Sequence, residues 1–356
     1  MSATSRTPSL ALQNAISQYE FDAARGYLGV ASMGLPTGET VAALSEDLQL
    51  WRSATRNLGD YGDIVERTRG HYADLVGIDV DRVAIGSQTS AIVSLFAAAV
   101  PSGAEVLCVE GDFSSMVFPF LQRDDVRVRC VPLAELAAEV SEATWLVAYS
   151  LAQSSTGAVA DVGAIADAAA RAGAFTLCDT TQAAGVHPVD ATQFDATVCH
   201  AYKWLCSPRG VAFLTIGERL SDQVTPLHAG WYAGESVWGS CYGPAMQLAA
   251  SARRFDVSPA WPAWVGAEPA IRMFASLDIA EIWARASGLG DALCDGLGIA
   301  RQHQAIVTWA DPEGHDLKRL TDAGLAVSGR AGRLRAAFHL WNDESDVDAV
   351  IAALRK

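Results

Sequence analysis

Two short segments place polar side chains directly after apolar runs, where such side chains could do chemistry. LCDTTQ (177–182) carries Asp179, and CHAYKW (199–204) carries Lys203. Ligands of open parallel sheets bind at the carboxyl ends of the strands, so an aspartate ending one strand and a lysine just past the next would meet at one edge. Taken singly, Asp179 also suits a helix N-cap and Lys203 a solvated surface. Side by side, however, the two residues could take part in one reaction.

A lysine among apolar neighbours loses its proton readily, because burial disfavours the ammonium form. Lys203 lies between Tyr202 and Trp204. A neutral amine forms a Schiff base with an aldehyde cofactor, and a carboxylate such as Asp179 keeps a pyridine nitrogen protonated, which makes the ring an electron sink. The two residues therefore predict a pyridoxal phosphate enzyme with Lys203 and Asp179 as catalytic residues.

The phosphate of such a cofactor needs an anion site on the same edge. Ser87, Gln88 and Thr89 stand where an apolar run passes into a helical pattern. Backbone N–H groups and hydroxyls at a helix N-terminus attract a dianion. This pattern is also that of an ordinary N-cap, but beside Asp179 and Lys203 it predicts the phosphate anchor.

These residues need a sheet to position them, and the chain shows one. Seven short, mostly apolar runs have the pattern of strands buried on both faces of a parallel sheet. The runs are 82–87, 105–111, 126–132, 144–150, 175–181, 196–202 and 211–217. The helical patterns between them are 88–100, 114–123 and 161–172. The alternation predicts an α/β fold: a large cofactor-binding domain (36–245) with a mostly parallel seven-stranded sheet, and a smaller α+β domain (1–35 and 246–356).

The composition limits the possible partners. The 356 residues carry a net charge of −15, which repels phosphate backbones and anionic lipids, so neither nucleic acid nor a membrane is expected as a partner. The sequence shows no apolar run of membrane-spanning length and no export signal, so we expect a cytoplasmic protein. The seven cysteines lack metal-site spacing, which predicts buried thiols and no metal.

The sequence resembles the class V aminotransferase group of pyridoxal phosphate enzymes, which have fold type I and include kynureninases and cysteine desulfurases. DTTQAAG (179–185) is similar to the family block whose aspartate pairs with the pyridine nitrogen. The glutamine of that block, here Gln182, contacts the ring oxygen in the family. CHAYKWL (199–205) is similar to the segment of the Schiff-base lysine, which places His200 and Tyr202 at phosphate-ligand positions.

Further blocks extend this resemblance over nearly the whole chain. GSQTS (86–90) occupies the phosphate-loop position. The resemblance implies that Phe113 stacks on the cofactor ring and that Ser154 is a polar group beside it. It also implies that Trp231, in AGWYAG, reaches the cofactor phosphate across a dimer, with Ser258 supplied by the neighbouring subunit. A homodimer is therefore expected.

The resemblance also implies where an amino-acid substrate would bind. RLRAAFHLWN (333–342) is similar to the strand whose arginine, here Arg335, holds the substrate α-carboxylate by a bidentate pair. Arg333, on the same face of that strand, is the alternative candidate for binding the carboxylate. Arg335 could also be an ordinary surface residue of the strand. We expect five residues to line a wide entrance to the substrate site: Arg254, Trp231, Trp238, Trp261 and Trp264. Tryptophans at such positions are also common in cores and interfaces.

Departures from the family pattern favour one reaction. The stretch 326–335 lacks the nucleophilic cysteine of the desulfurases, and SPAWPAW lacks the asparagine with which kynureninases recognise their aromatic substrate. The run ARRFDVSPAW most resembles a narrower branch, which includes the ergothioneine-pathway C–S lyase and enzymes of S-cysteine conjugates in lincosamide synthesis. This implies β-elimination from an S-substituted cysteine, yielding a thiol, pyruvate and ammonia. Decarboxylation-coupled oxidative deamination and transamination remain alternatives.

Overall fold

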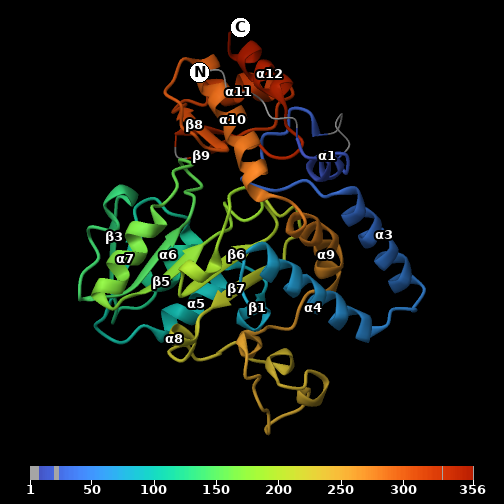
Figure 1. Cartoon of the computed structure of the whole chain (residues 1–356), viewed down its shortest axis with the longest axis vertical. Coiled ribbons are helices and arrows are strands. Elements are labelled where there is room, and N and C mark those ends of the chain that lie inside the picture. The colour runs from blue at the N-terminus through green and yellow to red at the C-terminus, as the bar shows by residue number, and fades with distance from the viewer. Residues whose placement is uncertain (1–7, 20–23, 331, 356) are drawn as a thin grey trace.

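The computed structural model describes residues 8–19, 24–330 and 332–355, and its centre is a seven-stranded sheet (Figure 1). The strands are β1 (Val83–Gly86), β2 (Glu105–Val109), β3 (Arg127–Val131), β4 (Thr144–Ser150), β5 (Phe175–Asp179), β6 (Ala196–His200) and β7 (Ala212–Ile216). Each lies within one of the seven apolar runs of the sequence. The predicted sheet is therefore confirmed.

The strand order in this sheet is β1-β7-β6-β5-β4-β2-β3. The pairs from β6 through β5, β4 and β2 to β3 are parallel. In contrast, β7 runs antiparallel to both of its neighbours, β6 and β1. The connection from β6 to β7 is therefore a hairpin, and it carries Lys203. The sheet is mostly parallel, as expected.

Helices cover both faces of the sheet, which explains why its strands are apolar throughout. Val106 and Cys108 of β2 belong to the buried cluster on the side of α5 (Thr89–Ala99) and α6 (Ser114–Leu121). Leu107, between them, packs in the cluster of α7 (Val162–Ala172). The three helices match the three helical patterns of the sequence, and α7 ends at Gly173, whose positive φ of 74° closes the helix as expected.

A second, smaller sheet lies at one end of the molecule, at the top of Figure 1. Its antiparallel strands, in spatial order, are β8 (Ile306–Ala310), β10 (Arg333–Ala337) and β9 (Ser328–Arg330). The helices of this part are α10 (Ile279–Leu297), α11 (His315–Asp322) and α12 (Glu344–Arg355). The C-terminal part thus has the α+β structure that the sequence indicates.

Of the other helices, α1 (Leu10–Ile16), α3 (Gly38–Arg52), α4 (Leu58–Leu75) and α9 (Trp261–Ala275) lie along the right side of the view, and the short α8 (Glu218–Ser221) lies at the lower left, below α5 (Figure 1). Helix α9 packs against α3 and α4. The domain boundary predicted at 245/246 stays a prediction. None of the described helices has the length and apolar character needed to cross a membrane.

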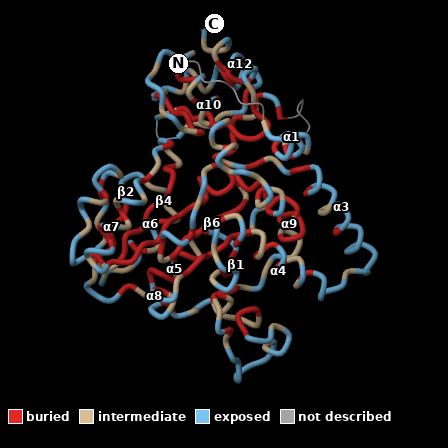
Figure 2. Tube along the Cα trace, viewed as in Figure 1, coloured by how far each residue is buried: buried red, intermediate tan, exposed pale blue. Residues whose placement is uncertain are grey.

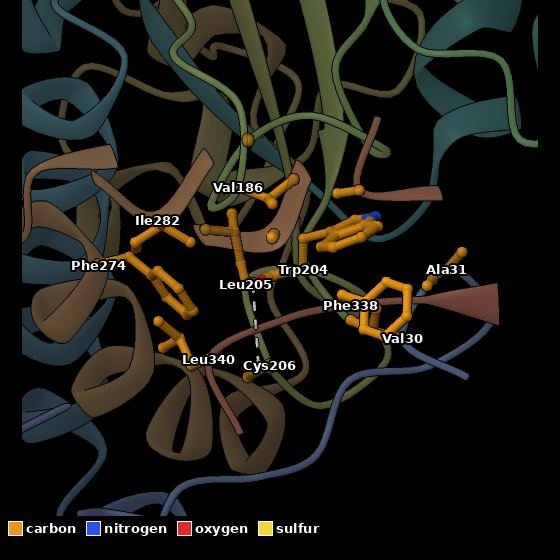
Figure 3. Packing of buried hydrophobic residues seen from close by; sticks show 14 of the residues in the cluster. Val30, Ala31, Val186, Trp204, Leu205, Cys206, Phe274, Ile282, Phe338 and Leu340 are labelled. Carbon is orange, nitrogen blue, oxygen red and sulfur yellow. Dashed lines mark hydrogen bonds between the residues drawn. The ribbon is translucent and has the colours of Figure 1, made fainter. Parts of the chain in front are cut away.

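Buried stretches run through the centre of the molecule (Figure 2), and one buried apolar cluster includes Ala201, Trp204 and Leu205 of the loop that carries Lys203. In Figure 3, Trp204 and Leu205 of that loop lie among Val30, Phe338 and other apolar side chains from both ends of the chain. The loop is thus packed on residues far from it in sequence.

Two backbone contacts brace the same loop. The Gly34 amide donates to the Tyr202 carbonyl oxygen (2.9 Å), and a Cβ at Gly34 would collide with the Lys203 carbonyl oxygen. From the other side, the His339 Nε2 atom is 2.8 Å from the Trp204 carbonyl oxygen. Burial lowers the pKa of His339 to about 4, so its imidazole is neutral at physiological pH and donates this hydrogen bond.

Candidate active site

A cavity of about 140 Å³ lies at the carboxyl ends of β5 and β6, where the sequence predicts the site. The cavity is lined by the loop before α5, the start of α6 and the ends of β5 and β6. The lining residues are Gln88, Thr89, Ser90, Phe113, Ser115, Asp179, Thr181, His200, Tyr202, Lys203 and Arg209. The structure therefore brings both predicted catalytic residues together.

Lys203 is buried in the cavity wall, with 5% of its surface exposed. Burial lowers the pKa of its amine to about 8, although the nearby Asp179 carboxylate favours the charged form. Its Nζ atom lies 5.1 Å from the centre of the Phe113 ring and 5.6 Å from that of Tyr202. Near pH 8 about half of such an amine is neutral and nucleophilic.

Asp179 ends β5 and is buried on the same cavity. Its Oδ1 atom accepts a hydrogen bond from the Thr181 backbone amide (2.8 Å). Burial raises the pKa of Asp179 to about 6, while the Thr181 hydrogen bonds and the Lys203 charge act in the opposite direction. The carboxylate is therefore ionised at neutral pH, and it is desolvated enough to interact strongly with a cationic group.

Other residues of the cavity lining are suited to an anion. Helix α5 begins after Gln88 without a side-chain cap, so N–H groups of its first turn are free for a ligand. The Arg209 guanidinium lies over the Tyr202 ring, 4.5 Å from its centre, and lines the cavity. The buried His200 Nε2 atom has no hydrogen-bond partner among the described residues. Burial, with the charges of Arg209 and Lys203, lowers the pKa of His200 to about 4. These donors fit a phosphate group.

Arg335 lies near the cavity, and its charge is among those that lower the pKa of Lys203. Its guanidinium, 4% exposed as a residue, donates to Ser328 Oγ (3.0 Å), the Ser154 carbonyl oxygen (2.5 Å) and Ser32 Oγ (2.8 Å). All three partners are neutral, and no described carboxylate pairs with it. Burial and the Arg330 charge lower the pKa of Arg335 to about 10. Such a cation is ready to bind a substrate carboxylate.

Arg333 points to a different place. It donates to the Thr308 hydroxyl (2.8 Å) and lines a hollow of about 690 Å³ that shares no residue with the cavity of Lys203. Of the two rival arginines, the geometry therefore favours Arg335 for the carboxylate role.

Several other expected site residues lie outside the cavity lining. The Gln182 amide accepts from the Trp204 indole (2.7 Å) and donates to the Ala31 carbonyl oxygen (3.0 Å). Arg254 donates to the Ser221 carbonyl oxygen (2.8 Å) at α8. The site roles expected of Gln182 and Arg254 stay predictions.

Four more predicted residues have their expected roles untested. Ser154 meets the site through its carbonyl oxygen, which accepts from Arg335. Ser87 and Ser258 are exposed, and Trp231 is half-buried. The Trp231 ring packs against Trp238 (5.1 Å between ring centres), away from the cavity lining. The roles given to Trp231 and Ser258 need a neighbouring subunit, so they stay predictions.

Sequence reasoning missed four residues of the lining and one residue behind it. The missed lining residues are Ser90, Ser115, Thr181 and Arg209. Behind the lining, the Asp112 carboxylate accepts from the Ser150 amide (2.8 Å) and hydroxyl, and so holds the loop of Phe113 against β4. The residue types around Arg209 carry no signal of its place in the cavity, which depends on how the loop after β6 folds.

With this geometry, the comparisons with known proteins identify the family. A sequence profile described as Aminotransferase class-V matches residues 27–317, so the chain belongs to the class V aminotransferase family. It is 27% identical over 238 residues to the uncharacterized aminotransferase YcbU of Bacillus subtilis, covering 63% of each chain. It is 29% identical over 258 residues to a kynureninase of Deinococcus radiodurans, covering 68% of this chain and 62% of that protein. The matches thus span about three fifths of these relatives.

Solved structures show the same fold. The cysteine desulfurase CsdA of Escherichia coli superposes with a TM-score of 0.83 at 19% identity, covering 98% of both chains. The cystine C-S lyase C-DES, in complex with cysteine persulfide, superposes with a TM-score of 0.84 at 18% identity, covering 94% of this chain and 99% of that one. Fold type I is therefore confirmed, and the family membership confirms pyridoxal phosphate as the expected cofactor. The narrower resemblance to ergothioneine and lincosamide enzymes stays a prediction.

Proposed function

We propose that this chain is a pyridoxal phosphate-dependent carbon–sulfur β-lyase that acts on an S-substituted cysteine. The observation that carries the proposal is the buried Lys203, whose pKa is lowered to about 8 and which shares one cavity with the ionised Asp179. Burial of both groups is costly for folding, and perturbed ionisable groups in a cleft are typical of catalytic sites.

Each residue has a role that follows from its position. Gln88, Thr89 and Arg209 would hold the cofactor phosphate, and Phe113 would cover the ring face. When bound, the cofactor supplies an electron sink that acidifies the substrate Cα. The Asp179 carboxylate would keep the pyridine nitrogen of the bound cofactor protonated, and the Lys203 amine would take the Cα proton of the substrate.

Elimination accounts for all atoms without a protein thiol. The Cα–H and Cβ–S bonds break, the sulfur leaves as a thiol with a proton, and water converts the remaining three-carbon fragment to pyruvate and ammonia. Arg335 holds the α-carboxylate during these steps. None of the residues that line the cavity is a cysteine, which argues against a persulfide formed on the chain.

Two other reactions can use the same residues. Transamination is one, and YcbU is named as an aminotransferase. Decarboxylation-coupled oxidative deamination is the other. Both leave the Cβ–S bond intact, so product analysis separates them from elimination.

The test is a product balance on the purified chain loaded with pyridoxal phosphate. S-methylcysteine and S-benzylcysteine are supplied, and thiol, pyruvate, ammonia and carbon dioxide are measured. We expect thiol and pyruvate in a one-to-one ratio, and no product from Lys203→Ala. Carbon dioxide release with oxygen consumption would instead indicate oxidative decarboxylation. A requirement for an added keto acid would indicate transamination, and either result refutes the lyase proposal.

We also propose that the chain acts as a homodimer. The segment between α8 and α9, which projects from the body in Figure 1, exposes large apolar side chains: Leu227 (61%), Trp238 (53%) and Tyr242 (91%). A projecting segment that exposes several large apolar side chains is a candidate interaction surface. Sedimentation velocity tests this, because Trp238→Ser combined with Tyr242→Ser should shift the dimer toward monomer. A wild-type chain that is monomeric at micromolar concentration would refute it.

A further inference from the structure

Two cysteines lie opposite each other on neighbouring strands at the edge of the large sheet. Cys108 of β2 and Cys130 of β3 are register partners in a parallel pair. Paired residues of neighbouring strands have Cα atoms about 4.8 Å apart, which is within the range of about 4.4–6.8 Å seen in disulfides. The backbone thus allows a covalent bond between the two sulfur atoms.

The two thiols are also on the same face of the sheet. Val106 and Cys108 belong to the core cluster beneath α5 and α6, and Val128 packs against that cluster. Because side chains alternate along a strand, Cys130 shares the face of Val128. The two sulfur atoms therefore face the same helical layer.

The two cysteines differ in access to solvent. Cys108 is completely buried, whereas Cys130 is exposed on the edge strand. This corrects the expectation that the cysteines are buried thiols, because Cys241 is exposed as well. An oxidant from solvent can therefore reach Cys130 directly, but it cannot reach Cys108.

The neighbouring thiol also activates the exposed one. The nearby Cys108 thiol lowers the pKa of Cys130 to about 7, although partial burial and the carboxylates of Glu110 and Asp112 act against this. A thiolate is the reactive form of cysteine, and exposed thiols with low pKa beside a second cysteine are typical of peroxide-sensitive sites.

We propose that Cys130 is a peroxide-reactive thiol and that Cys108 resolves its oxidised form as an intramolecular disulfide. The Cys130 thiolate attacks one peroxide oxygen, the O–O bond breaks, and hydroxide leaves with a proton as water. The resulting sulfenic acid is then attacked by the Cys108 sulfur, which loses its proton while a second water leaves. Two thiols are oxidised, and one hydrogen peroxide is reduced to two water molecules.

The expected rate advantage is modest. At pH 7 a thiol of pKa 7 is half ionised, about 15 times more than a free cysteine of pKa about 8.5. Its lower basicity reduces its intrinsic nucleophilicity about fivefold, so the net gain is about threefold. Cys130 differs from an ordinary exposed cysteine mainly because a second thiol lies beside it, and less because of the threefold gain in rate.

The experiment treats the full chain with stoichiometric hydrogen peroxide and maps disulfides by peptide mass spectrometry without reduction. We expect a linked peptide pair that joins Cys108 to Cys130. In Cys108→Ser, the linked pair should be lost and Cys130 should be trapped by dimedone as a sulfenic acid. Cys241→Ser is the matched control, and it should leave the linked pair unchanged.

Two results would overturn the proposal. One is the absence of the linked pair in the wild type under conditions where Cys241 is oxidised. The other is loss of the free Cys130 thiol in the peroxide-treated wild type that is no faster than loss of the free Cys241 thiol. Neither measurement depends on activity, so the outcome is independent of the proposed lyase reaction.

Discussion

Replacing Arg335 by alanine is the sharpest test of how this site would hold an amino acid. Its guanidinium is buried against three neutral oxygen acceptors, and no described carboxylate neutralises it. A substrate carboxylate would supply the missing charge in a site with little solvent screening. Losing one partner of such a buried pair costs on the order of 2–4 kcal/mol. Affinity should then fall about 30- to 900-fold.

The assay is rapid mixing of S-methylcysteine with the chain loaded with pyridoxal phosphate, in which the initial absorbance change of the cofactor gives the affinity before the amino acid is consumed. The same titration with 2-(methylthio)ethylamine, which lacks the carboxylate, is the control for indirect effects of the substitution. We expect Arg335→Ala to weaken only the amino acid. Arg333→Ala should change neither affinity, because its guanidinium braces Thr308 beside a different hollow.

Equal losses for both ligands would mean that Arg335→Ala disturbs the site as a whole. An unchanged amino-acid affinity would refute the carboxylate role, and a loss in Arg333→Ala alone would transfer that role to Arg333. Thermal unfolding of each variant shows whether the three hydrogen bonds of Arg335 also support the fold.

Two further predictions concern the ionisable groups. The rate at which pyridoxal phosphate attaches to the apo chain should rise with pH and level off above about 8, because only the neutral Lys203 amine reacts. Borohydride trapping followed by mass spectrometry measures this rate. Lys203→Ala should show no attachment. In Asp179→Asn the midpoint should move below 8, since the Asp179 charge favours the ammonium form, and an unmoved midpoint would contradict their coupling. The raised pKa of Asp179 also costs stability: this cost is absent below pH about 4 and is complete once the pH has risen through about 6. Apo Asp179→Asn should therefore be more stable than wild type at pH 8 by up to about 3 kcal/mol in urea unfolding, and the gap should vanish at pH 4.

The sequence was sufficient to predict the strands and the meeting of Asp179 with Lys203. Buried strands are short apolar runs, and strand ends on one edge bring their following residues together, so both predictions follow from local pattern. The direction of a strand cannot be predicted from such a run, because a strand buried on both faces has the same apolar pattern whether it is parallel or antiparallel to its neighbours. The antiparallel β7 was therefore not predicted from the residues.

The remaining parts of the site depend on tertiary contacts. Arg209 reaches the cavity because the hairpin after β6 folds back over Tyr202, which residue types do not reveal. Gln182 follows the family motif, but the Trp204 indole and the Ala31 carbonyl engage its amide. Arg254 likewise binds at α8. In each case long-range packing decides where a polar side chain points.

The bracing of the Lys203 loop from both ends of the chain has a consequence for biosynthesis. Gly34 supports the loop from the N-terminal side, and His339 binds it from the last strand-and-helix unit. On the ribosome, the large sheet is complete well before residue 339 emerges, yet the reactive amine then lacks its final support. Residue 339 must therefore leave the ribosome before the loop of the reactive amine gains this hydrogen bond.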